Sequence, residues 1–277
     1  MSDLASQEPL PAWGWQFAAG HLPPVHPMGL PAPITEDWAW AGSTGAGVKV
    51  AVIDSGVDAS HPRVGSVQGG VVVEPDDAAP GGVRVTETPH EDLFGHGTAC
   101  AAIIRSLAPD CEIYSVRVLG TKLSGRGTVF AAGLEWAINA GMHVANLSLS
   151  TGRANYFGMF HRLADRAYFA GTTIVAAINN VPAPSYPAQF ASVVSVAARD
   201  ADEGLAYNPT PPVEFGAPGI DIDVAWLNGK SVRASGNSFA CPYVAGVVAR
   251  VLGKHSGLTP FEVKTVLRAV SSNAKGA

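Results

Sequence analysis

Three residues in separate apolar segments, Asp54, His96 and Ser238, are of the types that nucleophilic catalysis requires. A serine hydroxyl is a weak nucleophile until a histidine takes its proton, and that histidine needs a buried carboxylate to hold its tautomer. Each residue alone is weak evidence, because an aspartate after a strand is common in turns, a lone histidine is more often structural, and a serine often caps a helix. Together, in the chain order Asp, His, Ser, they predict a catalytic triad.

The segments around these residues predict how they are positioned. Asp54 ends the apolar run VKVAVID, and in an open α/β sheet the carboxyl ends of strands are where sites form. His96 lies between two glycines at the start of an apolar helical stretch. Ser238 opens another apolar helix, where backbone N–H groups and the positive end of the helix dipole lie beside it.

Short apolar runs alternate with helical stretches from about residue 48 onward. This pattern predicts an α/β fold of three layers, with a mostly parallel central sheet and helices on both faces. We expect helices over residues 128–140 and 259–271, and a hairpin turn at Asn228-Gly229. The expected strands end at or near Asp54, Val118, Leu149, Ala177 and Val196.

The domain organisation follows from where this alternation begins. Residues 1–40 are rich in proline, tryptophan and small residues without a period, and we expect an irregular N-terminal extension there. Residues 41–277 show no repeat or long linker, so they are predicted to form one domain.

Composition excludes several classes of function. Charged residues make up 15% of the chain and the net charge is −5, so nucleic acid is not an expected partner. The apolar runs are too short to cross a bilayer, which predicts no membrane partner. The first residues lack the pattern of a secretory signal and the three cysteines cannot all pair, so we expect a cytoplasmic protein. The alternative is a secreted mature domain without its signal.

The motifs DSGVDASHP, GHGTACAA, YSVRVLG, ANLSLS, VAAIN, YPA and GNSFACPYVAG occur in this order between about Gly45 and Leu252. They resemble the successive signature segments of the subtilisin, or subtilase, family of serine peptidases (peptidase S8). The resemblance implies a subtilisin-like fold and hydrolysis of peptide bonds by Asp54, His96 and Ser238.

The resemblance also implies an oxyanion hole and a substrate-binding cleft. Asn179 matches the family's oxyanion asparagine, and the alternative is that Asn179 or Asn180 merely caps a strand. In the family, the positions of Ile178, Ser150 and Ser185 line the pocket for the side chain that precedes the cut bond. Here they are larger than the usual glycine, which predicts a narrowed pocket. The expected substrate-binding residues are Ser124, Gly125, Ser148, Leu149, Ser150, Ala176, Ile178 and Ser185.

No cofactor or metal is expected. Many subtilases bind calcium through an aspartate that here is Arg63, and through a loop for which the run from His96 to Pro109 is too short. We therefore predict that this calcium site is absent. The histidines show no spacing typical of a zinc site.

The sequence thus predicts a serine endopeptidase that acts on polypeptide or peptide substrates, and it leaves the oligomeric state open. Three alternatives remain: a dedicated peptide-maturation protease, a transpeptidase that transfers the acyl group to an amine, and a scaffold that kept the fold and lost the chemistry.

Overall fold

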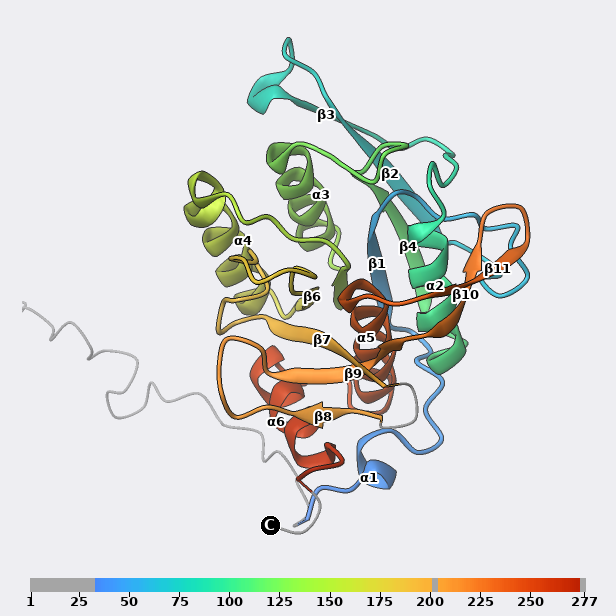
Figure 1. Ribbon diagram of the computed structural model, residues 1–277, viewed down its shortest axis with the longest axis vertical. Coiled ribbons are helices and arrows are strands. Elements are labelled where there is room, and N and C mark those ends of the chain that lie inside the picture. The colour runs from blue at the N-terminus through green and yellow to red at the C-terminus, as the bar shows by residue number, and fades with distance from the viewer. Residues whose placement is uncertain (1–32, 201–203, 275–277) are drawn as a thin grey trace, which may run out of the picture. The chain divides into compact units, whose positions relative to one another are not determined.

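One nine-stranded sheet dominates the part of the chain that the computed structural model describes, residues 33–200 and 204–274 (Figure 1). The strand order is β3-β2-β4-β1-β5-β6-β7-β9-β8. Neighbours from β2 to β9 pair in parallel, and the edge strands β3 and β8 pair antiparallel. The strands are β1 (Lys49–Asp54), β2 (Gly69–Pro75), β3 (Val83–Thr86), β4 (Glu112–Arg117), β5 (Val144–Leu147), β6 (Thr173–Ala177), β7 (Val194–Asp200), β8 (Ala206–Tyr207) and β9 (Phe215–Ile220).

Helices cover both faces of this sheet. One apolar core contains buried side chains of α1 (Glu36–Trp40), α2 (His96–Leu107), α5 (Asn237–Lys254) and α6 (Pro260–Val270). The other contains those of α3 (Gly127–Asn139) and α4 (Phe157–Phe169). Two short 3-10 turns, η2 (Pro80–Gly82) and η3 (Ala154–Tyr156), precede β3 and α4. The predicted three-layer α/β fold is therefore confirmed.

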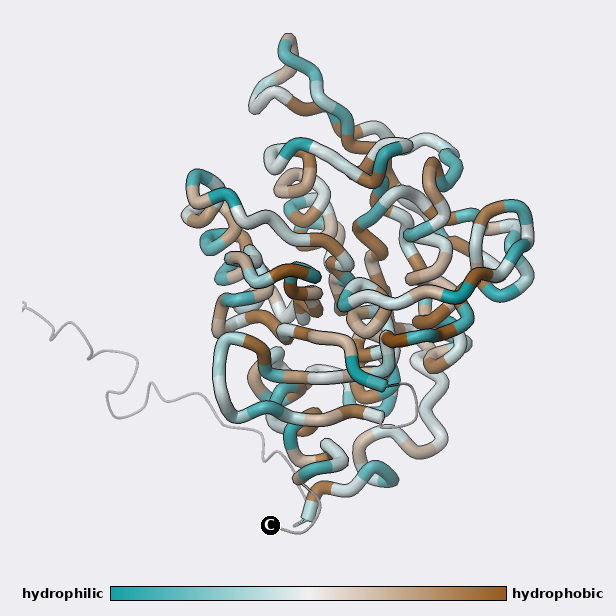
Figure 2. Tube along the Cα trace, viewed as in Figure 1, coloured by the Kyte–Doolittle hydropathy of each residue, from teal (hydrophilic) through white to brown (hydrophobic). Residues whose placement is uncertain are grey.

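Strand β1 shows why the sequence forms two cores. Successive side chains of a strand point to opposite faces. Val50 and Val52 accordingly lie in the core under α2 and α5, whereas Ala51 and Ile53 lie in the core under α3 and α4. All four are fully buried, which explains the continuous apolar run. The hydrophobic stretches follow the central strands, and many outer turns are hydrophilic (Figure 2).

Several elements match the expectations and others do not. The five expected strands correspond to β1, β4, β5, β6 and β7, and the expected helices to α3 and α6. The hairpin is also confirmed, because β10 (Ile222–Trp226) pairs with β11 (Lys230–Ala234) across Asn228 and Gly229, which both have positive φ. The β2–β3 hairpin, α4, β8 and β9 were not predicted.

The expected irregular extension over residues 1–40 lies mostly outside the described residues. Its described end is partly regular, because Glu36–Trp40 forms α1, capped by the Thr35 side chain, and Ala39 is fully buried. No described helix has the length and apolar character needed to cross a membrane.

The strand order places Asp54 at a favourable position. Strand β1 lies between β4 and β5, so the chain continues from β4 to the opposite side of β1. Such a change of direction opens a crevice at the carboxyl ends of the strands, where open α/β sheets bind ligands. Asp54 is the last residue of β1 and lies at this end.

Candidate active site

Asp54 and His96 form a buried hydrogen-bonded pair. His96 Nδ1 lies 2.9 Å from both carboxylate oxygens of Asp54. The exposed fractions are 0% for Asp54 and 5% for His96, so water does not screen the pair. The backbone N–H of Ser55 donates to Asp54 Oδ1 at 2.8 Å. These contacts hold the proton of His96 on Nδ1 and leave Nε2 as the acceptor.

Glycines allow this close approach of β1 and α2. A Cβ atom at Gly97 would lie 2.0 Å from the carbonyl oxygen of Gly56 and 3.2 Å from Cβ of Asp54, so no other residue fits there. Gly95, just before α2, has φ 109°, a conformation that side chains disfavour. The GHG motif thus brings His96 to the strand end.

Asp92 is a positioning residue that the sequence reasoning missed. It is 6% exposed, and its carboxylate accepts hydrogen bonds from Ser55 Oγ at 2.7 Å and from the N–H and hydroxyl of Thr98 at 2.9 and 2.6 Å. The N–H groups of Phe94 and Gly95 donate to it as well. Asp92 therefore ties the turn after β1 to the start of α2. Its place four residues before His96 was the only sequence signal.

Ser238 lies in the first turn of α5, half-buried, and lines the same cleft as His96. This cleft measures about 480 Å³. No hydrogen bond joins Ser238 Oγ to His96 Nε2 within the described residues. Such bonds are often long before substrate binds. Other residues predicted for the site also line the cleft: Ser124, Gly125, Ser148, Leu149 and Ser150.

Four predicted residues lie elsewhere. Ala176 is fully buried in β6, and Ser185 is 1% exposed, with its hydroxyl accepting from the N–H of Asn179 at 2.9 Å. Ile178 packs against the core under α3 and α4. The Asn179 side chain accepts from Ser150 Oγ at 2.8 Å and donates to the carbonyl of Pro184 at 2.6 Å. None of these four is among the residues that line the cleft.

Asn180, the next residue, does line the cleft. Its Oδ1 accepts from the N–H of Asn237 at 3.0 Å, and its Nδ2 has no acceptor in the described part of the chain. Asn237 in turn donates through Nδ2 to the carbonyl of Asn179 at 3.0 Å and accepts from the N–H of Ala198 at 2.8 Å. Asn237 therefore ties the turn after β6 to the start of α5, next to Ser238.

The three cysteines are free and buried, as expected for small apolar residues. Cys100 lies beneath the pair: its Sγ is 3.9 Å from Asp54 Oδ2 and donates to Ser148 Oγ at 3.2 Å. Burial raises the pKa of the Cys100 thiol, so it stays neutral.

Asp54, His96 and Cys100 offer ligand atoms within 4.8 Å of one another, and no other such cluster occurs in the described residues. A metal ion there would occupy His96 Nδ1 and displace its proton. Metal binding and the Asp54–His96 hydrogen bond are therefore mutually exclusive.

The surroundings of His96 change its pKa. Burial is the largest single influence on the pKa of His96 and lowers it, but the charge and hydrogen bonds of Asp54 together with the neighbouring Cys100 raise the pKa well above 6.5. The imidazole is thus a stronger base than a free histidine, and the nearby carboxylate stabilises its charged form.

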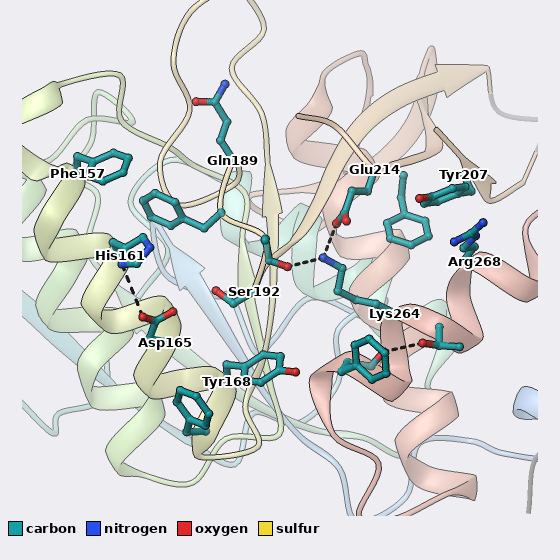
Figure 3. A pocket seen from close by; sticks show the side chains of 16 residues that line it. Phe157, His161, Asp165, Tyr168, Gln189, Ser192, Tyr207, Glu214, Lys264 and Arg268 are labelled. Carbon is teal, nitrogen blue, oxygen red and sulfur yellow. Dashed lines mark hydrogen bonds and ion pairs between the residues drawn. The ribbon is translucent and has the colours of Figure 1, made fainter. Parts of the chain in front are cut away.

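A second hollow of about 740 Å³ lies between α4 and α6 (Figure 3). Here His161 and Asp165 are half-exposed and 3.7 Å apart, and Lys264 pairs with Glu214 at 2.7 Å. It shares no lining residue with the cleft that contains His96 and Ser238. The candidate active site is therefore the smaller cleft.

Comparison with known proteins agrees with this geometry. The model of the "Subtilase family" matches residues 45–276. The chain is 34% identical to "M-protease" of Shouchella clausii (strain KSM-K16) over 92% of its own length and 63% of the relative's. It is 33% identical to "Subtilisin Savinase" of Lederbergia lenta over 94% and 91%. A crystal structure of "a cold adapted subtilisin-like serine proteinase" aligns with TM-score 0.67 and 29% identity, covering 81% of this chain and 82% of that one.

These relatives correct one expectation. Subtilisin homologues are secreted extracellular proteases, so the prediction of a cytoplasmic protein is wrong. The missing signal pattern and the cysteine content were not valid grounds for it. The predicted family and the subtilisin-like fold, in contrast, are confirmed by the match over most of the chain. The chain belongs to the subtilase family.

Proposed function

We propose that this chain is a serine endopeptidase in which Ser238 is the nucleophile, His96 the general base and Asp54 the residue that orients His96. The observation that carries the proposal is the buried pair of Asp54 and His96, 2.9 Å apart, in a cleft whose lining includes both His96 and Ser238. The subtilisins and alkaline proteases among its relatives support the same reaction.

The chemistry follows from these positions. Ser238 Oγ attacks the carbonyl carbon of the peptide bond while His96 Nε2 takes the hydroxyl proton. His96 then gives this proton to the leaving amine, and the C–N bond breaks. Water, deprotonated in turn by His96, hydrolyses the acyl-serine and releases the acid. Asp54 keeps its charge and stabilises the imidazolium in both steps.

We assign the oxyanion donors to the backbone N–H of Ser238 and Nδ2 of Asn180, in place of Asn179. The first N–H groups of a helix have no partner within it, and Ser238 lies in the first turn of α5. Asn180 lines the cleft with its Oδ1 held by Asn237, which leaves Nδ2 for a ligand. Both polar ends of the Asn179 side chain are already engaged.

Asn180→Ala should lower kcat by about 10²- to 10³-fold, because one donor to the oxyanion is lost. The loss should be similar for all peptide substrates, since every peptide bond forms the same oxyanion. Steady-state kinetics on a set of peptides checks this. If Asn179→Ala causes the uniform loss and Asn180→Ala does not, the original assignment to Asn179 is correct.

Asn179 has a different role in this proposal. Of the three positions expected to narrow the pocket for the residue before the cut bond, only Ser150 lines the cleft, and Asn179 holds the Ser150 hydroxyl while it also donates to the carbonyl of Pro184. We expect the wild type to prefer alanine or serine there, and Asn179→Ala to increase cleavage after leucine or phenylalanine relative to alanine by about tenfold. Mass spectrometry of a digested peptide library measures this ratio. A wild-type preference for large aromatic residues would refute the narrowed pocket.

The proposed function is tested by incubating the purified chain with a fluorophosphonate probe and with casein. Peptide mapping locates the labelled residue. If this residue is Ser238 and casein is also digested, the result supports a general endopeptidase. Labelling without digestion favours a dedicated maturation protease, and ligated products favour a transpeptidase. No labelling favours the inactive scaffold. No cofactor is part of the proposal, and the absence of the family calcium site stays a prediction.

A further inference from the structure

The charged side chains that line the cleft are positive. Its titratable lining residues are His96, Arg126, Arg153 and Tyr156, and among the residues that the structure describes no aspartate or glutamate lines it. The whole chain has a net charge of −5, so the cleft differs in sign from the protein as a whole. This local excess of arginine favours a negatively charged ligand.

Arg153 is the more available of the two cations. It is exposed, and it forms no ion pair with any residue in the ranges that the structure describes. Its backbone is well anchored: its N–H donates to Thr151 Oγ1 at 3.3 Å, and Thr151 pairs with Tyr186 through backbone bonds of 3.0 and 2.9 Å. The guanidinium group therefore extends from a fixed support at the edge of the cleft.

Arg126 immediately precedes α3 and has only a weak competitor. It lies 3.2 Å from Asp77 Oδ1, with side-chain exposures of 59% and 88%. Ion pairs this exposed contribute little, because water screens them. A carboxylate bound in the cleft can therefore replace Asp77 as the partner of Arg126.

We propose that Arg153, assisted by Arg126, selects peptide substrates that carry an aspartate or glutamate side chain in the segment bound along this cleft. A guanidinium group binds a carboxylate through two parallel, charge-assisted hydrogen bonds, which a neutral amide cannot match. This inference rests on the proposed function, since it concerns the substrate class of the same site.

The test uses pairs of fluorogenic peptides that differ by one residue, Glu or Gln, at each position around the cut bond. At the best position and low ionic strength, kcat/KM should be about three- to fivefold higher for Glu. In about 1 M NaCl the ratio should fall towards one, because the Debye length shrinks to about 3 Å. The salt measurement needs no variant and so does not depend on folding of a mutant.

Variants then assign the effect to a residue. Arg153→Gln should reduce the Glu/Gln ratio to about one, and Arg153→Glu should make a Lys peptide the preferred one. The matched control is Arg162→Gln, an exposed arginine of α4 that does not line the cleft, and it should keep the wild-type ratio. Equal cleavage of Glu and Gln peptides by the wild type, or a ratio that persists in Arg153→Gln, overturns this inference alone. If the wild type cuts no peptide, the proposed function fails as well.

Discussion

Ser238→Ala is expected to lower kcat for peptide hydrolysis by about 10⁶-fold, the magnitude that loss of the nucleophile has in subtilisin. The physical reason is that alanine offers no oxygen to attack the carbonyl, so the acyl-enzyme cannot form. The change removes one atom from a half-buried side chain that makes no hydrogen bond within the described residues. Stability should therefore change by less than about 0.5 kcal/mol.

Single-turnover kinetics on a fluorogenic peptide measures the rate, and thermal unfolding measures the stability. The fluorophosphonate probe should label the wild type and not the variant. A variant with normal stability that retains more than a small fraction of the activity would show that Ser238 is not the nucleophile.

Asp54→Asn should lower kcat by about 10⁴-fold at neutral pH. An asparagine amide that donates to Nδ1 of His96 would leave the proton on Nε2, where the base is needed. The shape of the pH profile should change too. His96 accepts a proton only when neutral, so kcat/KM of the wild type rises with pH through a pKa well above 6.5.

Without the Asp54 carboxylate, burial lowers the pKa of His96 and only the smaller influence of Cys100 opposes it. The pH range over which kcat/KM rises should therefore move to lower pH in Asp54→Asn. The matched control is Asp165→Asn, which removes the carboxylate from the half-exposed His161 pair on α4 and should leave kcat and the profile unchanged. An unshifted range in Asp54→Asn would mean that Asp54 does not control the titration of His96.

The sequence allowed most of the sheet to be predicted, because buried parallel strands have continuous apolar runs and Asp54 follows one of them. Helix α4 was missed although Phe160, Leu163, Ala164 and Ala167 lie at helical spacing and are buried. The β2–β3 hairpin was missed because most residues of β3 are exposed, so its sequence has no alternation of buried apolar and exposed polar residues.

The site shows a different limit. Asn179 and Asn180 are identical neighbours, and only the turn after β6 decides that one engages Ser150 and the other lines the cleft. The role of Asp92 depends on Ser55 and Thr98, which meet it only in the folded protein. Residue types predict which chemistry is available, whereas side-chain direction requires the structure.

Both His96 and Ser238 lie in the first turn of a helix, α2 and α5, so two helix amino termini converge on the cleft. Each such end carries a partial charge of about +0.5. Negative charge is therefore favoured there at two stages of the reaction. In the proposed mechanism, the field that would stabilise the developing oxyanion would also attract the new terminal carboxylate of the cleaved peptide, so we expect bond breaking to be fast and release of the acid product to be slower.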